Sequence, residues 1–217
     1  MLLSDVEIRQ AMKEKRIIIE PFNEQSLQAA SYDLRIGKRM LVSGEENEIN
    51  METKYSQSLK AGQFALLTTS EKITLSNDIA AHIGMKSYYV RKGIILLSGL
   101  QIDPTWKGFL VLGLYNASPR SITLDYQSTI CSIDFYSLAV PCLKTFQSNE
   151  EQESGFIPKM DKDYLRTLET STLSEMSESV RHLSENVGRL SNIMYKVLVP
   201  LIVGIYLAIL GALFLVK

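Results

Sequence analysis

The chain contains few of the residues that bind metals or form cross-links. It has only two histidines and two cysteines among 217 residues. Cys131 and Cys142 lack the spacing of zinc ligands, and His82 and His182 are isolated in the sequence. We therefore expect two reduced thiols and no zinc site.

The chain also lacks a strong net charge. Lys and Arg total 23 against 24 for Asp and Glu, which gives a formal net charge of −1. Proteins that neutralise nucleic-acid phosphates carry an excess of basic residues, so nucleic-acid binding is not expected. Residues 1–16 have charges spread through them and no apolar centre, which excludes a signal peptide.

A run of 20 residues just before the C-terminal lysine contains no charged side chain. Residues 197–216 read VLVPLIVGIYLAILGALFLV, and only Lys217 follows them. As a helix, about 20 residues span the ~30 Å hydrocarbon core of a bilayer, whereas a buried helix of that length usually keeps a polar face. We expect a single-pass transmembrane anchor over 197–217. Arg189 and Lys196 precede the span, which favours a cytoplasmic location for residues 1–196.

A narrow apolar stripe precedes this span. Its residues alternate in steps of three and four, with polar residues between them, as in a coiled coil that associates with copies of itself. We expect a coiled-coil stem over 163–196, joined to the rest by a polar linker over 147–162. The stripe consists of Leu173, Met176, Val180, Leu183, Val187, Leu190, Met194 and Val197.

Residues 1–146 have the pattern of one mainly-β domain. Ser4 and Glu7 form a capping box, which predicts a helix over 5–15. Short β-prone runs separated by turn residues then predict a sandwich or barrel. The predicted strands are 17–19, 32–36, 64–69, 94–97, 109–115, 121–124 and 129–135.

Three segments carry a family resemblance. Residues 1–12 (MLLSDVEIRQAM), 30–37 (ASYDLRIG) and 86–135 together resemble the dCTP deaminase branch of the trimeric dUTPase superfamily. The resemblance implies a distorted β-sandwich that assembles as a trimer, with nucleotide sites between subunits. A trimeric head would suit a three-stranded coiled-coil stem.

The resemblance also implies a nucleotide site. Ser87 and Arg91 match the family's phosphate-binding serine and arginine, and Asp103 matches an aspartate that faces the sugar. Lys86 replaces an arginine and so lacks its bidentate fork. Tyr88 replaces a second serine with a bulkier side chain.

One position departs from the family in a way that affects catalysis. The strand GFLVLGLYN, residues 108–116, matches the strand that carries the family's catalytic glutamate, and Gly113 stands at that position. Deamination without zinc needs a base that takes a proton from water and returns it to the leaving amine. Glycine can do neither, so we assign no catalytic residue and no metal ligand.

These observations predict a membrane-anchored, dCTP deaminase/dUTPase-like protein that binds a deoxynucleotide or related ligand and is catalytically impaired. It would act as a nucleotide sensor or a trimeric membrane effector. Two alternatives are an active dCTP deaminase or dUTP pyrophosphatase on the membrane, and a trimeric scaffold without a nucleotide ligand. The expected partners are two further copies of the chain in a homotrimer, the lipid bilayer, and the deoxynucleotide or related small ligand. No resident cofactor is predicted, and a magnesium-bound nucleotide is left open.

Overall fold

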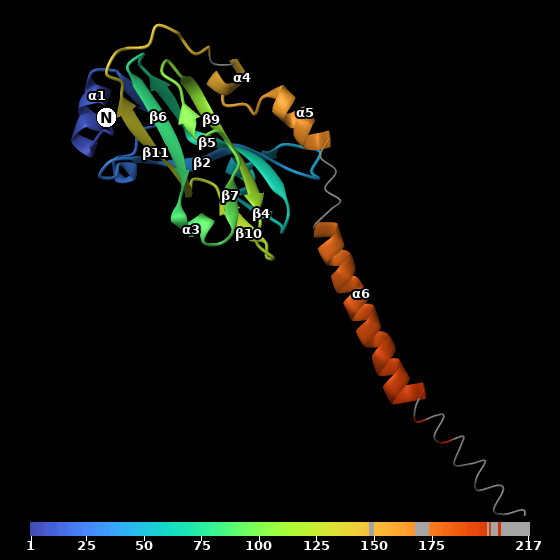
Figure 1. Ribbon diagram of the computed structural model, residues 1–217. Coiled ribbons are helices and arrows are strands. Elements are labelled where there is room, and N and C mark those ends of the chain that lie inside the picture. Colours follow the sequence, from blue (N-terminus) through green and yellow to red (C-terminus); the bar gives the residue numbers. More distant parts are fainter. Residues whose placement is uncertain (148–149, 168–173, 199, 201–203, 205–217) are drawn as a thin grey trace, which may run out of the picture. The chain divides into compact units, whose positions relative to one another are not determined.

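The computed structural model describes residues 1–147, 150–167, 174–198, 200 and 204 (Figure 1). The chain divides into two compact units, residues 1–170 and 171–217. The first unit is the head and includes the first residues of the predicted stem, and the second contains the rest of the predicted stem and the predicted anchor.

The head begins with helix α1 (Asp5–Lys13), which the capping box starts as predicted. The Ser4 hydroxyl accepts a hydrogen bond from the Glu7 N–H, and the Glu7 carboxylate accepts one from the Ser4 N–H at 2.8 Å. Ile8 and Ala11 lie on the buried face of the helix. The local sequence therefore determines both the start of α1 and its packing side.

Antiparallel strands build the rest of the head (Figure 1). The main sheet runs β7-β9-β5-β2-β11-β6-β8, with β1 paired to β5 and β3 to β2, while β10 and β4 form a separate pair. All seven predicted strands are present, which confirms the mainly-β prediction. The strands are β1 (Ile17–Glu20), β2 (Tyr32–Val42), β3 (Ile49–Asn50), β4 (Ser56–Leu59), β5 (Phe64–Leu75), β6 (Ile79–Met85), β7 (Ile94–Leu96), β8 (Gln101–Ile102), β9 (Lys107–Asn116), β10 (Ile122–Asp125) and β11 (Thr129–Ser137).

Strand β9 separates the main core from a second, smaller apolar cluster. Leu110, Leu112 and Leu114 point into the core and are at most 5% exposed. Because side chains alternate along a strand, Val111 and Gly113 lie on the opposite face. That face is only partly covered, since the Val111 side chain is half-buried.

Residues 150–167 belong to the head rather than to a free linker. They form α4 (Glu150–Glu153) and α5 (Lys159–Thr167), and the compact unit reaches Thr170. Ile157 and Leu165 are 0% and 1% exposed, respectively. The polar composition of 147–162 predicted a linker and hid Ile157, whereas Leu165 lies within the residues predicted as the stem. The shorter helices of the head are η1 (Glu24–Ser26), α2 (Met51–Lys54) and α3 (Ser87–Val90).

The described part of the second unit is α6 (Ser174–Ile193), continued by the π-helical turn η2 (Met194–Leu198). Val180, Leu183, Val187 and Leu190 of the predicted stripe are all more than 60% exposed. The helix is as predicted, whereas its pairing into a coiled coil stays a prediction. Most of the predicted anchor lies outside the described residues, and no helix within the described part is long and apolar enough to cross a bilayer.

Candidate functional site

The first candidate residue, Lys86, forms an ion pair with Asp33 of the head. Lys86 immediately precedes α3, and its Nζ donates to both carboxylate oxygens of Asp33 at 2.9 Å. The Asp33 side chain is 12% exposed, so this ion pair is shielded from water on one side. Much of the charge of Lys86 is therefore compensated before any phosphate arrives.

Ser87 and Arg91 are the exposed members of the stretch that is predicted to bind phosphate. Ser87 is the first residue of α3 and Arg91 its C-cap, and both side chains face solvent. The Arg91 N–H donates to the Ser87 carbonyl at 3.0 Å, which fixes the two residues one helical turn apart. An exposed guanidinium beside a hydroxyl is suited to charge-assisted hydrogen bonds with phosphate oxygens.

A hollow of about 710 Å³ lies beside α3. Tyr88 forms part of its lining, and the Lys92 ammonium lies 3.9 Å from the centre of the Tyr88 ring. The wall therefore combines an aromatic face with a cation, a combination that accommodates planar or anionic ligands. The remaining lining residues are Ser118, Pro119, Arg120, Ser121, Ile122, Thr123 and Asp125.

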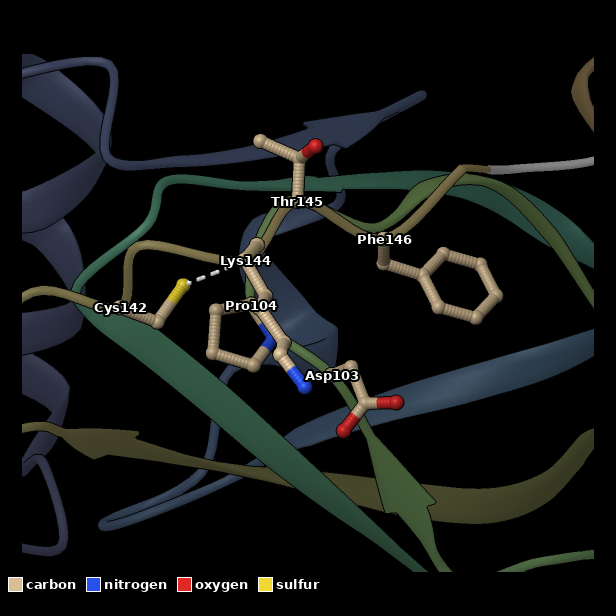
Figure 2. A pocket seen from close by; sticks show the side chains of 6 residues that line it. All are labelled: Asp103, Pro104, Cys142, Lys144, Thr145 and Phe146. Carbon is tan, nitrogen blue, oxygen red and sulfur yellow. Dashed lines mark hydrogen bonds between the residues drawn. The ribbon is translucent and has the colours of Figure 1, made fainter.

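Asp103 lies in a different hollow, of about 340 Å³ (Figure 2). The carboxylate of Asp103 accepts a hydrogen bond from the Gln101 side-chain amide at 2.7 Å. Four residues of segment 142–146 line the rest of this hollow, and Figure 2 shows their side chains together with Asp103 and Pro104: Cys142, Lys144, Thr145 and Phe146. Among the described residues, no hydrogen bond or ion pair joins Asp103 to Ser87 or Arg91. A single chain thus presents the two halves of the predicted site separately.

The turn after Asp103 has an unusual backbone. Thr105 has φ 68°, a left-handed value that β-branched residues rarely adopt. Its Oγ1 accepts a hydrogen bond from the Phe146 N–H at 2.6 Å and donates to the Phe146 carbonyl at 3.4 Å. The Phe146 ring stacks on Trp106 at a centroid distance of 5.0 Å. Thr105 therefore ties segment 142–146 to the Asp103 turn.

Thr105→Gly is expected to loosen this segment while changing the free energy of unfolding by less than about 1 kcal/mol. Glycine relieves a backbone cost of about 1–3 kcal/mol, which roughly offsets the loss of two hydrogen bonds worth about 0.5–1.5 kcal/mol each. Trp106, the only tryptophan, should report the change through its fluorescence emission. Thr105→Ser keeps the hydroxyl and should emit like the wild type; identical spectra for both variants would contradict the argument.

Gly113 stands where the family resemblance places a carboxylate, and its surroundings leave little room for one. Gly113 pairs with Leu66 across strands β9 and β5, and its N–H donates to the Ser98 hydroxyl at 2.6 Å. A Cβ added to Gly113 would lie 3.1 Å from Cζ of Phe64, closer than ordinary carbon contacts. The ring of Phe64 thus borders the space into which a side chain at position 113 would extend.

Sequence reasoning missed the most deeply buried charge of the head. Glu71 is 0% exposed, and its carboxylate accepts hydrogen bonds from Arg35 Nε at 2.6 Å and the Arg35 N–H at 2.9 Å. Burial raises the pKa of Glu71, although the bonds from Arg35 oppose the shift. No local spacing pattern links these two positions, which meet only through strand packing. Glu71 has no access to solvent, so we assign it a structural role.

The described residues contain no cluster of three or more His, Cys, Asp or Glu side chains that could hold a metal ion. Cys131 is fully buried, and burial raises the pKa of its thiol. Cys142 is half-buried, and its thiol donates to the Lys144 carbonyl at 3.1 Å (Figure 2). Buried Cys131 lacks the exposed, cationic surroundings of a reactive cysteine, whereas Cys142 lines the same hollow as Lys144.

Known proteins resemble the head along most of its length. Residues 2–138 match the dCTP deaminase-like (DCD) family. The dCTP deaminase of Pyrococcus abyssi is 38% identical over 149 residues, covering 69% of this chain and 92% of the relative. That of Pyrococcus horikoshii is 38% identical over 157 residues, covering 72% and 96%, respectively.

A solved structure supports the same fold. The crystal structure of 2′-deoxycytidine 5′-triphosphate deaminase from Agrobacterium tumefaciens aligns with a TM-score of 0.52 at 21% identity, covering 62% of this chain and 47% of that one. At this identity the likeness shows the fold alone. The family match over residues 2–138 and the relatives at 38% identity establish that the chain belongs to the dCTP deaminase-like family.

Proposed function

We propose that this protein binds a deoxynucleotide through its head without deaminating it. The observation that carries the proposal is Gly113, with the ring of Phe64 beside it, at the position that the family resemblance assigns to the catalytic carboxylate. Ser87 and Arg91 remain exposed and able to contact phosphate. The binding half of the site is thus retained, and the proton-transferring half is absent.

The chemistry explains why this one position matters. Hydrolytic deamination of a cytosine ring needs a base to deprotonate the attacking water and an acid to protonate the departing amine. Neither the Gly113 backbone nor the Ser98 hydroxyl bonded to it is an acid–base group of the kind that performs these two proton transfers. Losing such a group typically reduces the rate by about 10²–10⁴-fold.

An active dCTP deaminase, or a related dUTP pyrophosphatase, is the second candidate. The relatives at 36–38% identity are named dCTP deaminase, and these names favour activity more directly than its loss. This candidate requires another carboxylate to reach the ring, and Asp103 is the one the sequence offers. In the described head, Asp103 lines a hollow of its own, so it would have to act on a ligand bound there.

Calorimetric titration of the full chain in detergent with dCTP, dUTP and dTTP, with products assayed in the same cell, separates the candidates. We expect binding without release of ammonia or pyrophosphate. Arg91→Ala should weaken triphosphate binding by about 10- to 150-fold, since a charge-assisted hydrogen bond contributes about 1.5–3 kcal/mol. Lys60→Ala, a change at an exposed lysine outside both hollows, serves as the control. Turnover would establish the second candidate, and absence of binding by every nucleotide would favour a scaffold.

We further propose that the protein is a membrane-anchored homotrimer. The exposed stripe on α6 supports self-association, because apolar side chains spaced in heptads bury one another in a coiled coil. The head has a second exposed apolar set around α3 and β7, formed by Tyr88, Val90, Ile95, Leu97 and Leu100. Residues 197–216 would hold the trimer in the bilayer, where it could act as a nucleotide sensor or membrane effector.

Replacing Leu183 and Leu190 together by Ser is expected to reduce the particle from three chains to fewer in detergent. Both side chains belong to one seam position and are 62% and 66% exposed in the single chain. Sedimentation with correction for bound detergent measures the mass. Glu178→Ser and Glu185→Ser, changes between the seam residues, should leave the mass unchanged. A wild-type protein that sediments as one chain would contradict the trimer.

A further inference from the structure

The end of the head folds back over the outer face of the sheet. We call residues 156–165 the latch. Ile157 and Leu165 of the latch are buried with Leu41 of β2 in a small cluster that is separate from the main core. Phe64, Leu66 and Val111 pack against this cluster from β5 and β9. The latch therefore covers side chains on the face of β9 that carries Val111.

Polar contacts accompany these apolar ones. We call the four residues that make them the clasp: Arg39, Glu48, Phe156 and Lys162. Glu48 accepts hydrogen bonds from Arg39 Nη1 at 2.6 Å and from the Lys162 ammonium at 2.7 Å, so it joins the sheet to the latch. The guanidinium of Arg39 also lies 3.8 Å from the centre of the Phe156 ring. Phe156 remains 41% exposed. The outer edge of the latch is thus held by partly solvated contacts, which are weaker than those of a sealed core.

The backbone at the start of the latch is suited to a bend. Gly155 has φ 76°, and a Cβ there would lie 3.2 Å from the Phe109 ring. Only glycine takes up this left-handed conformation without strain, and only glycine fits so close to the ring. A hinge here would let residues 156–165 move away while α4 stays in place.

The latch and the vacant catalytic position share one side chain. Phe64 packs against the cluster that contains Ile157 and Leu165, and the same ring lies beside Gly113. Val111 and Gly113 are two residues apart on β9 and so point to the same face of the sheet. An open latch would remove packing that holds Phe64 in place and would expose this face to solvent.

We propose that the latch is an autoinhibitory cover. When closed, it holds Phe64 beside Gly113, and local opening at Gly155 exposes the Val111 and Gly113 face of β9. The role in ligand access rests on the proposed function, whereas the opening itself can be measured without any ligand.

Thiol labelling of the full chain tests the opening. Val111→Cys in a Cys142→Ser background places a reporter thiol under the latch, and buried Cys131 reports unfolding of the whole head. Phe156→Ala with Lys162→Ala removes the ring and the ammonium of the clasp. We expect the reporter thiol to react with a maleimide at least tenfold faster in this latch variant, while Cys131 stays protected.

A matched control removes an apolar side chain and a lysine elsewhere, with Leu143→Ala and Lys60→Ala, both exposed positions. In this control, the reporter thiol should react with the maleimide at the same rate as in the reporter protein with an intact latch. Equal rates in the latch variant and the control would overturn the proposal. The proposal would also be overturned if the reporter thiol under an intact latch reacted as fast as a thiol in an unfolded peptide. Labelling of Cys131 at the same rate as the reporter thiol would overturn it as well, because the whole head would then be unfolding.

The association rate of dCTP, measured on the same proteins, tests ligand access. If only the open form binds, the rate should rise in the latch variant by the factor found for labelling. Equal association rates, with binding present, would show that the latch does not control the site. If no protein bound any deoxynucleotide, the proposed function would fail while the labelling result still decided whether the latch opens.

Discussion

Arg35→Met is expected to lower the free energy of unfolding by about 3–5 kcal/mol, because it leaves a buried carboxylate without its cation. The Glu71 side chain is 0% exposed, and Arg35 Nε donates to it at 2.6 Å. Methionine fills much of the same space but supplies no donor. The N–H of residue 35 would remain as a donor to the carboxylate. Urea denaturation of the full chain, followed by Trp106 fluorescence, measures the loss.

The pH dependence of this loss identifies its cause. Burial raises the pKa of Glu71 above its ordinary value of 4.5, and removing Arg35 should raise it further. A carboxyl group with a raised pKa in the folded protein stabilises the fold below its unfolded pKa, and this contribution is lost as the pH rises through the folded pKa. The deficit of Arg35→Met relative to the wild type should therefore grow as the pH rises above the folded-state pKa of Glu71 in the wild type, which itself lies above 4.5. Glu71→Gln has no charge to bury, so a similar pH trend in that variant would refute this explanation.

The fold could be predicted largely because its strands carry local signals. Strands β5 and β9 alternate or repeat apolar residues, and the capping box marks the start of α1. Four strands were missed, and the two longest of them lack such signals: β4 reads SQSL and β6 reads IAAHIGM, with small or polar residues at half the positions or more. Their pairing with β10 and β11 comes from the sheet as a whole.

The sequence named the residues of a candidate site but not their contacts. The resemblance pointed to Lys86, Ser87, Arg91, Asp103 and Gly113, whose roles stay predictions. It could not show that Lys86 is bound to Asp33, because the two residues are 53 positions apart. The latch was hidden by its own composition, since two apolar anchors in a polar segment do not form a periodic pattern. Two kinds of feature could therefore not be predicted from the sequence: ion pairs between residues far apart in the chain, and single apolar residues buried within a polar segment.

Phe64→Ala combined with Gly113→Glu is expected to raise the rate of dCTP deamination by about 10²–10⁴-fold over the wild type. The single change Gly113→Glu should not, because its Cβ would meet the Phe64 ring at 3.1 Å and its carboxylate would be forced against an apolar surface. Removing the ring opens the space in which a carboxylate could face bound water. Chromatography of the nucleotide products and an ammonia assay measure the rate.

The control for this gain is Phe64→Ala with Gly113→Gln, which has nearly the same shape as the glutamate variant and shares any loss of stability from the missing ring. Glutamine cannot accept a proton from water at neutral pH, so this protein should stay at the wild-type rate. A gain in both double variants would assign the effect to space alone. A wild-type protein that already converts dCTP as fast as the glutamate variant would show that a different carboxylate serves as the base. The absence of a side chain at Gly113 would then be a feature of ligand shape, and the search for the base would begin with Asp103, the carboxylate in the second hollow.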